Sequence, residues 1–596
     1  MSGRRQLNSW LLLVLVASGI YLGCIISPPS LMDDVDSVQA VISRSMLVSG
    51  DWVTPHIDGV PYFEKGPLVY WAIAGSFKIF GVHDWAARIP IALSAIALCL
   101  LTAAFGVWAF GKRAGLYAGL CIVTSVGLFL FTRILIPDVM LTFCCALALW
   151  SYLRLMDDEE PRPRLWAFLL AASMGAGLLL KSLIAIVFPL GAMLVHMALT
   201  RRLFVRRTWQ RLHPFTGLLV IFLIAAPWHI LAAIRNPPIF AFTLHSGPHN
   251  YHGFLWFYFI NEQLLRFLNL RYPRDYNTVP RLYFWLFHLI WLFPWSVYLP
   301  AVAKLRYRPV DRAGDARLLC LCWIGFVLVF FTFSTTQEYY SMPCYPAFAL
   351  LLGSAMQEGG DWVRRGTVAL RVILGACAVA AFAILFAVRH VPTPGDIASS
   401  LGYHPKDYTL SLGHMLDLRL DSFAYLRMPL FFAGVAFLFG AFGTLRKFSE
   451  RTFVFTAIMM LLFFQAARLA MVTFDPFLSS RPIAEEILKL PPGQLILNRH
   501  FYPYSSVGFY TNRPALLTNG RVMNLEYGSN APGAPDVFLD PSEFQKLWNG
   551  PGRCYFVANK REFPPFEALM DFSRRDVVME SAGKLLVTNL PLPDHP

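Results

Sequence analysis

Carboxylates and a carboxylate–lysine pair are concentrated in one polar stretch of the sequence, residues 31–70. Asp33, Asp34 and Asp36 lie within four residues of one another, and Glu64 is followed directly by Lys65. A carboxylate can take the proton of an attacking hydroxyl, and a lysine can stabilise the charge of a departing phosphate. These residue types therefore predict a group-transfer site in this stretch.

The rest of the chain indicates what must position that stretch. Its 596 residues are 56% hydrophobic and only 15% charged, which predicts a polytopic α-helical membrane protein. A bilayer core needs about 20 apolar residues per helix, and about thirteen segments qualify. They are 10–26, 88–110, 114–132, 139–155, 165–180, 182–199, 214–234, 281–302, 318–334, 343–357, 367–389, 428–446 and 452–471.

The basic residues predict the topology. Arg4 and Arg5 precede the first apolar segment, which lacks a convincing cleavage site, so we expect a retained signal-anchor helix with a cytoplasmic N-terminus. The short basic loops then fall on the cytoplasmic side, as the positive-inside rule requires. This explains the net charge of +14 without a nucleic-acid partner, and we expect none.

Two domains follow from this topology. Residues 1–474 form a transmembrane catalytic domain whose outer loops are 27–87, 235–280 and 390–427. Residues 475–596 form a soluble extracytoplasmic α/β domain. Its predicted helices cover 483–490, 541–549 and 563–570, and its predicted strands cover 495–498, 507–510, 515–517, 554–558 and 585–588.

The outer loops are predicted to contain interfacial helices. Residues 35–48 place apolar side chains on one stripe and Gln39, Ser43 and Arg44 on the opposite face. Residues 67–80 begin with a proline in the first turn, and residues 253–268 carry Arg266 within an aromatic pattern.

Further polar residues lie on the same predicted side of the membrane. Asp138 follows Pro137 at the start of a helix, where a helix cap and a catalytic role are equally favoured. Tyr340 lies between two helices, at a depth where tyrosines are usually interfacial belt residues.

An outward-facing transfer site restricts the donor. Nucleotide sugars and ATP are cytoplasmic, whereas a sugar on a polyprenyl phosphate can be carried through the membrane. Lys65 and Arg266 are the cations best placed to hold the phosphate leaving group, and Arg offers a bidentate fork. Asp33 and Asp138 are the candidate bases for an acceptor hydroxyl.

The motifs of these loops carry a family resemblance. The pieces MDDVDSVQAVISRSML, GDWVTP, YFEK and PLVYW resemble the first outer loop of the GT-C glycosyltransferases, which include aminoarabinose lipid A transferases and, more distantly, protein O-mannosyltransferases. RILIPD, NEQLLRF and EYYSMPCYPAFALL extend it, and SSVGFYTNRP does so faintly.

The resemblance implies a GT-C membrane enzyme of the bacterial inner membrane and cell envelope, with thirteen helices. It would move a sugar with inversion from a polyprenyl-monophosphate donor, such as an undecaprenyl phosphate, to a lipid, glycan or protein acceptor. Lipid A is one such acceptor. The implied catalytic residues are Asp33, Asp138 and Glu64, and the implied substrate-binding residues are Lys65, Arg266, Tyr340 and Tyr62.

Two departures from the family pattern bear on the substrate and on metal binding. Asp36 stands where an arginine is typical, which gives Asp33, Asp34 and Asp36 an Asp-x-Asp arrangement suited to a divalent cation of the Mg or Mn type. Gln263 stands where a histidine is typical, which argues against a transition-metal site shared with Glu64. The sugar and the acceptor therefore stay open.

Two other classes compete with an enzyme. A transporter or flippase would be expected to place ionisable residues at mid-membrane on broken helices, often within inverted repeats. The apolar segments here are mostly free of charge at their centres, and no repeat is evident. The other alternative is a catalytically inactive receptor or scaffold that binds through its outer domain.

Overall fold

A computed structural model describes residues 2–26, 29–273, 279–401, 418–445, 450–498 and 502–592. The three predicted outer loops therefore lie partly outside the described residues: 27–87 at its first two positions, 235–280 at 274–278 and 390–427 at 402–417.

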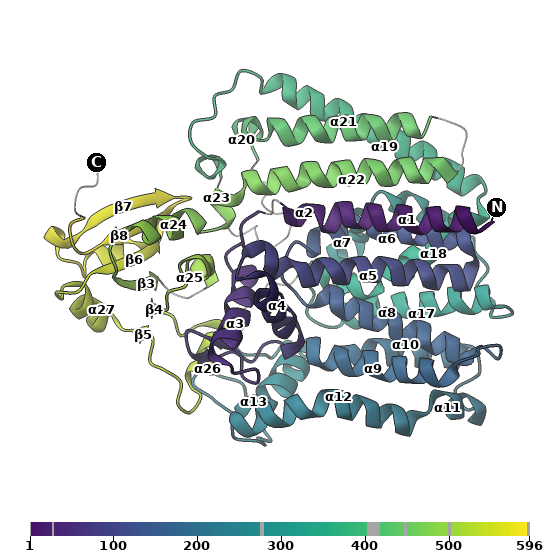
Figure 1. Cartoon of the computed structure of the whole chain (residues 1–596), viewed down its shortest axis with the longest axis horizontal. Coiled ribbons are helices and arrows are strands. Elements are labelled where there is room, and N and C mark those ends of the chain that lie inside the picture. The colour runs from purple at the N-terminus through teal and green to yellow at the C-terminus, as the bar shows by residue number, and fades with distance from the viewer. Residues whose placement is uncertain are drawn as a thin grey trace.

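A bundle of roughly parallel helix axes forms the larger part of the molecule (Figure 1). The apolar sequence of these helices exposes large hydrophobic side chains on the outside of the bundle, as a lipid-facing surface requires. The long helices are α1 Ser2–Tyr21, α5 Asp84–Phe110, α6 Lys112–Val123, α8 Asp138–Met156, α9 Pro163–Lys181, α10 Ile184–Leu199, α12 Pro214–Arg235, α17 Arg312–Thr332, α18 Tyr345–Glu358, α19 Asp361–Ala387, α21 Arg427–Gly443 and α22 Glu450–Thr473.

Shorter helical segments connect or extend these helices. They are α2 Gly23–Ile26, α7 Val126–Phe131, α11 Arg206–Leu212, α14 Arg281–Leu286, α15 His288–Trp291, η2 Trp295–Tyr298, α16 Leu299–Val302, η4 Ile397–Ser400, α20 Leu420–Tyr425 and α23 Asp475–Leu478.

Every predicted apolar segment coincides with at least one helix, but thirteen membrane-spanning helices are not confirmed. Among the described residues, 7 helices are long and apolar enough to cross a membrane, or up to 8 if the bent pair Arg281–Trp291 and Trp295–Val302 is one span. In other predicted segments the helix is broken, which leaves shorter helices. The segment 114–132 is divided between α6 and α7, where the hydroxyls of Thr124 and Ser125 donate to the carbonyls of Leu120 and Ile122.

One end of the bundle carries the elements of the first loop, namely α3 Val35–Ser49, the hairpin β1 His56–Ile57 and β2 Val60–Pro61, and α4 Pro67–Phe80 (Figure 1). Both helices were predicted. Gly50 ends α3 in the left-handed conformation, and Pro67 begins α4. The predicted polar face of α3 is not solvated, however. Gln39 and Ser43 are fully buried, and Arg44 donates to the carbonyls of Gly508 and Phe509.

The C-terminal residues form a six-stranded sheet of order β5-β4-β3-β6-β8-β7. The first four strands in this order are parallel to one another, and β8 and β7 continue the sheet antiparallel. The strands are β3 Gln494–Asn498, β4 Ala515–Thr518, β5 Phe538–Leu539, β6 Cys554–Asn559, β7 Asp576–Ser581 and β8 Lys584–Thr588. The accompanying helical segments are α24 Arg481–Lys489, η7 Tyr502–Tyr504, α25 Ser505–Thr511, α26 Met523–Ser529, α27 Pro541–Trp548, η8 Lys560–Glu562, α28 Pro564–Glu567 and η9 Phe572–Arg574.

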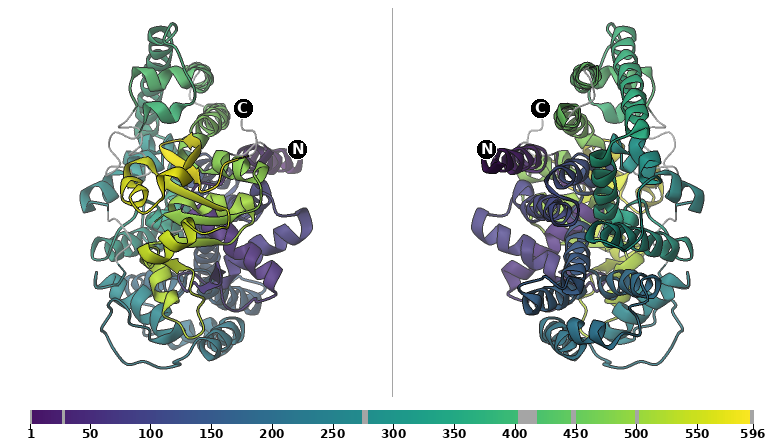
Figure 2. Two further views of the ribbon diagram at one scale, coloured as in Figure 1. Left: turned by 90° about the vertical axis from the view of Figure 1, so that its left-hand side faces the viewer. Right: turned by 90° about the vertical axis from the view of Figure 1, so that its right-hand side faces the viewer.

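The predicted α/β character of this region is confirmed, and one predicted strand is wrong. Residues 507–510 lie in α25, which packs against α3. Figure 2 shows the sheet over the ends of the bundle helices, on the side of the first loop. The C-terminal region therefore covers the end of the bundle that carries the charged stretch.

Candidate active site

A cavity of about 300 Å³ lies at this end of the bundle, bordered by the first loop, α8, α9, η1 Trp256–Leu265 and η3 Glu338–Cys344. Its lining is divided into polar and apolar residues. The polar residues are Glu64, Lys65, Asp138, Lys181, Ser182, Tyr258, Glu262, Gln263, Arg266, Ser334, Thr335 and Tyr340, and the apolar ones are Leu141, Leu183, Ile184, Val187, Phe188, Phe259, Leu264, Phe267, Phe330, Phe331 and Pro343.

The charged groups of the cavity form three pairs. In each pair a nitrogen of a cation lies within 3 Å of a carboxylate oxygen, and both side chains are largely buried. The pairs are Lys65–Glu64 at 2.6 Å, Lys181–Asp138 at 2.6 Å and Arg266–Glu262 at 2.9 Å. Each cation therefore already has a carboxylate partner, and an incoming anion would have to share the cation with that carboxylate or replace it.

The first loop brings Glu64 and Lys65 against α9. Gly66 lies so close to this helix that a Cβ at this position would come within 2.2 Å of the Leu179 carbonyl oxygen. Pro67 then begins α4, so the chain turns away directly after the pair. The close approach at Gly66 is what places Lys65 beside the end of α9.

The protonation states of the pair follow from its contacts. Burial raises the pKa of Glu64, but Lys65 and the hydrogen bonds from Lys65 and Tyr62 outweigh it and hold the pKa below its usual range. Burial lowers the pKa of Lys65, but Glu64 outweighs it and raises the pKa above its usual value. Burial keeps the pKa of Tyr62 well above 10, so Tyr62 donates to Glu64 as a neutral phenol. Glu64 is therefore anionic and Lys65 cationic.

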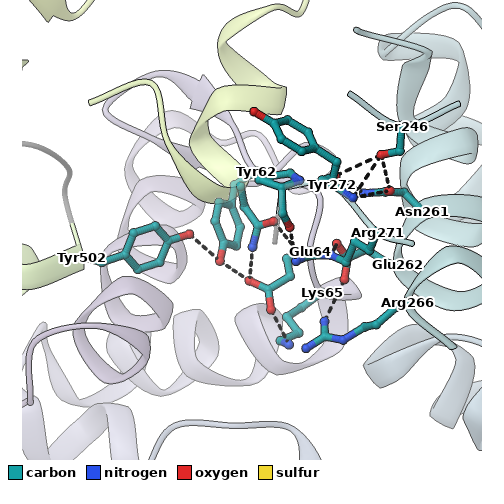
Figure 3. A network of polar contacts seen from close by, with 12 residues as sticks. Tyr62, Glu64, Lys65, Ser246, Asn261, Glu262, Arg266, Arg271, Tyr272 and Tyr502 are labelled. Atoms are coloured by element: carbon teal, nitrogen blue, oxygen red, sulfur yellow. Dashed lines mark hydrogen bonds and ion pairs between the residues drawn. The ribbon is translucent and has the colours of Figure 1, made fainter. Parts of the chain in front are cut away.

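Arg266 comes from an irregular helix. The predicted helix over 253–268 consists of α13 Gly253–Leu255 and the π-helix η1, and Arg266 caps the latter. Its guanidinium donates to Glu262 at 2.9 Å and to the Tyr340 hydroxyl at 2.9 Å. π-Helical segments are rare and frequently occur at functional sites. Arg266 and Glu262 both line the cavity, and Figure 3 shows them beside Glu64 and Lys65 of the first loop.

Asp138 is the first residue of α8, and its side chain does not cap that helix. Its carboxylate instead accepts a hydrogen bond from Lys181, the last residue of α9. The ammonium group of Lys181 also lies 4.9 Å from the ring centre of Tyr340, within cation–π range. The sequence left a helix cap and a catalytic role open for Asp138, and the prediction of a helix cap is therefore wrong.

Known proteins share parts of this sequence. The family model described as dolichyl-phosphate-mannose-protein mannosyltransferase matches residues 64–231. A Pseudomonas aeruginosa protein named undecaprenyl phosphate-alpha-4-amino-4-deoxy-L-arabinose arabinosyl transferase is 30% identical over 402 residues, 64% of this chain and 66% of its own. A protein of the same name from Aeromonas salmonicida is 27% identical over 360 residues, 58% of this chain and 60% of its own. The chain thus matches less than two thirds of the length of these relatives.

Among solved structures, the crystal structure of ArnT from Cupriavidus metallidurans bound to undecaprenyl phosphate is similar over nearly the whole chain. The TM-score is 0.78 at 23% identity, covering 99% of this chain and 98% of that one. The chain has the GT-C fold. The resemblance drawn from the loop motifs is thereby confirmed.

Within this GT-C fold, five of the predicted site residues line the cavity. They are Glu64, Lys65, Asp138, Arg266 and Tyr340. Tyr62 lies behind them and reaches the cavity through its hydrogen bond to Glu64. Lys181 was not predicted, although the sequence holds a signal: a lysine on a short turn predicted to lie outside departs from the positive-inside rule.

Asp33 does not line the cavity. One carboxylate oxygen accepts from the backbone amide and hydroxyl of Ser506, at 2.9 and 2.7 Å. The other accepts from Lys584 at 2.6 Å and from Ser480 at 2.7 Å. Asp33 therefore ties the first loop to the C-terminal sheet region, and these contacts do not support the catalytic role that the resemblance implies.

The acidic triplet does not converge on a shared site. The Asp36 carboxylate is buried against Arg88 at 3.0 Å and accepts from the Leu135 amide at 2.8 Å, away from the contacts of Asp33. Among the described residues, no three His, Cys, Asp or Glu side chains come together as a metal site. The predicted metal roles of Asp34 and Asp36 thus lack a common ligand geometry. A divalent-cation requirement stays a prediction.

Glu64 is also a poor metal ligand in this arrangement. Its two carboxylate oxygens accept hydrogen bonds from Tyr62, Lys65 and Asn524. Gln263, which stands where the family has a histidine, lines the cavity and brings no imidazole. These residues do not fit a transition-metal ion.

The C-terminal region supplies contacts that the sequence did not predict. Asn524 of α26 donates to Glu64 at 2.8 Å, and the Tyr502 hydroxyl donates to that of Tyr62 at 2.9 Å. Figure 3 shows Tyr502 approaching Tyr62 from the side opposite Arg266. Contacts between residues more than 400 positions apart leave no periodic signal in a single sequence.

Proposed function

We propose that this protein is an inverting glycosyltransferase that moves a sugar from a polyprenyl-monophosphate donor to a lipid, glycan or protein acceptor. The observation that carries the proposal is the division of the cavity lining. Lys65, Lys181, Arg266 and the Tyr340 hydroxyl lie at its polar part, and a wall of phenylalanine, leucine and isoleucine side chains completes it. An amphipathic donor has the same division between a phosphate head and an apolar chain.

The cation pairs support binding of the phosphate. Phosphate oxygens can replace one carboxylate partner of Lys65 and Arg266 at little cost, because both carboxylates keep other donors. Glu64 keeps Tyr62 and Asn524, and Glu262 keeps Arg271 at 2.5 Å. Charge-assisted hydrogen bonds of this kind stabilise a leaving phosphate without protonating it.

The displacement needs one base and one leaving-group site. The acceptor oxygen forms a bond to the anomeric carbon while the bond from that carbon to the phosphate oxygen breaks. The polyprenyl phosphate leaves with the electron pair, and the hydroxyl proton passes to a carboxylate. Asp138 is our choice for that base, because it faces the cavity and Asp33 does not. Lys181 orients its carboxylate.

The sugar and the acceptor are restricted only partly. The relatives are named for an amino-deoxy-arabinose carried on undecaprenyl phosphate, and an undecaprenyl-type donor is our proposal for this chain. Of the two departures from the family motifs, Asp36 is buried away from the cavity, whereas Gln263 lines it. Gln263 is therefore the departure that can change which substrate is accepted.

The protein is a multi-span membrane protein, and we propose the bacterial inner membrane with the cavity and the C-terminal region on the periplasmic face. The proposed reaction uses a lipid-linked sugar and needs no cytoplasmic nucleotide sugar, which supports the periplasmic side. Labelling of Gln545→Cys tests it, since Gln545 is exposed on α27 whereas the native Cys554 is buried. Labelling from the cytoplasmic side alone would overturn the orientation.

Lipid analysis of the purified protein tests the donor class. We expect polyprenyl monophosphate or its glycosylated form to copurify with the wild type. Arg266→Ala should retain roughly tenfold less, because one charge-assisted anion contact is lost. The exposed Arg364 of α19 gives a matched control in Arg364→Ala, which should retain the lipid. Equal retention by Arg266→Ala, or copurification of an unrelated lipid class alone, would contradict the proposed donor site.

A further inference from the structure

Helix α26 of the C-terminal region lies between the first loop and the helical segment formed by α13 and η1. A Cβ at Gly528 would lie 1.8 Å from the Pro61 carbonyl oxygen, so the helix and the loop are in direct backbone contact. On the other side, the Tyr527 ring lies 4.2 Å from that of Phe257, centre to centre, and its hydroxyl donates to the Gly253 carbonyl at 2.8 Å. These contacts hold α26 in one position relative to both elements.

Asn524 of α26 connects the two elements through its side chain. Its amide nitrogen donates to Glu64 at 2.8 Å, and its carbonyl oxygen accepts from Arg271 at 2.6 Å. Arg271 in turn donates to Glu262 at 2.5 Å, and Glu262 accepts from Arg266 at 2.9 Å. A continuous chain of hydrogen bonds thus runs from Lys65, the partner of Glu64, to Arg266.

A carboxamide is the group that this position requires. Glu64 is anionic and needs a donor, whereas the guanidinium of Arg271 needs an acceptor. The opposite orientation of the amide would direct its NH₂ group at a cation and its oxygen at an anion. Asn524 is only 4% exposed, so water does not readily substitute for either contact.

We infer that Asn524 is a positioning residue of the proposed transfer reaction, and that the C-terminal region completes the active site by fixing the separation of Lys65 and Arg266. This inference rests on the proposed function. Asn524 does not line the cavity, so it touches neither the donor nor the acceptor in the proposed reaction. It sets Glu64 and Arg271, and through them the two cations that hold the phosphate.

The decisive variant is Asn524→Asp, assayed in the full-length protein for transfer from a polyprenyl-phosphate sugar between pH 5.5 and 8. At pH 8 the new carboxylate repels Glu64, and we expect kcat/KM to fall roughly tenfold or more. Glu64 raises the pKa of a carboxylate at position 524, and Arg271, which is already paired with Glu262, opposes this effect in part. Acidification should therefore protonate the aspartate, restore a donor to Glu64 and recover part of the activity relative to the wild type at the same pH.

Two further variants accompany Asn524→Asp, the first as its control and the second as an independent test. Asn549→Asp makes the same change in the same region, on a side chain that accepts from the Asp571 amide, and should leave the pH profile unchanged. Tyr502→Phe removes the hydroxyl that donates to Tyr62, whose own hydroxyl donates to Glu64, and should raise KM for the donor.

The outcomes separate this inference from the proposed function. If the wild type transfers sugar and Asn524→Asp follows its pH profile at any constant fraction of activity, the positioning role is wrong, because a merely structural defect does not recover with acid. If Asn524→Asp does not fold, an unchanged donor KM in Tyr502→Phe overturns the inference. If the wild type transfers no sugar from any polyprenyl-phosphate donor, the proposed function itself is wrong.

Discussion

Lys181 and Asp138 are joined by a hydrogen bond of 2.6 Å, although they lie 43 residues apart at the ends of α9 and α8. The contact places a carboxylate with a fixed orientation in the wall of the cavity. It also gives the cavity a third cation beside Lys65 and Arg266.

Asp138→Asn tests the base. Asparagine keeps the size of the side chain and can still accept from Lys181, but it cannot take a proton. We expect kcat to fall about 10²–10⁴-fold while KM for the donor changes little. Steady-state kinetics at varied donor concentration measure both. A kcat close to that of the wild type would transfer the base role to another carboxylate.

Asp33→Asn separates anchoring from catalysis. Loss of the charge interaction with Lys584 should lower the stability of the C-terminal region by about 1–3 kcal/mol, while the activity per folded molecule stays within a few-fold of the wild type. Thermal unfolding and transfer assays at low temperature give the two numbers. Lys584→Met is the matched variant, and the double variant should not be additive. Abolished transfer with an unchanged melting temperature would instead support the catalytic role implied by the family resemblance.

Asp58 predicts a pH dependence of stability. Its Oδ2 is enclosed without a hydrogen-bond partner among the described residues. Burial raises its pKa to about 7, against smaller opposing effects of the Ala515 amide and Arg44. Because the folded-state pKa lies above the unfolded value, the unfolded chain loses this proton first as pH rises. The contribution of Asp58 to stability therefore declines from about pH 4 to about pH 7.

Asp58→Asn should remove this decline. The melting temperature of the variant minus that of the wild type should grow between pH 5 and pH 7, by an amount equivalent to about 2 kcal/mol. A constant difference over this range would show that Asp58 is ionised at pH 5 in the folded protein.

Chelation tests the predicted divalent cation. The contacts of Asp33 and Asp36 keep their carboxylates apart, so this triplet offers no shared ligand site among the described residues, and activity that persists after exhaustive treatment with a chelator would remove the prediction. Loss of activity that Mg²⁺ or Mn²⁺ restores would support the sequence prediction and would require ligands other than this triplet.

The sequence predicted elements whose signals are local. The apolar segments predicted the bundle helices, and Pro67 predicted the start of α4. Residues 507–510 were mistaken for a strand because an apolar and aromatic run satisfies either period. Packing against α3 decides for a helix.

The candidate site was predicted where a motif carried it and missed where a distant segment supplied it. Glu64, Lys65 and Arg266 lie in motifs of the outer loops, and the structure brings them together. Asp33 lies in such a motif too, yet its carboxylate is directed to Ser506 and Lys584. Neither this orientation nor the contact of Asn524 with Glu64 follows from local sequence, because both depend on how α25 and α26 pack against the first loop.

Sugar transfer by the purified protein tests whether Lys65 stabilises the leaving phosphate of a polyprenyl-phosphate donor. The wild type, Lys65→Ala and the control Lys78→Ala, a substitution at an exposed position of α4, are assayed with a radiolabelled polyprenyl-phosphate sugar and an outer-leaflet lipid extract as acceptor. We predict transfer by the wild type and by Lys78→Ala, and roughly 10²-fold or greater loss in Lys65→Ala, as removal of one preorganised charge-stabilising group produces. Full transfer by Lys65→Ala would contradict the proposed role of Lys65 and with it the proposed phosphate site.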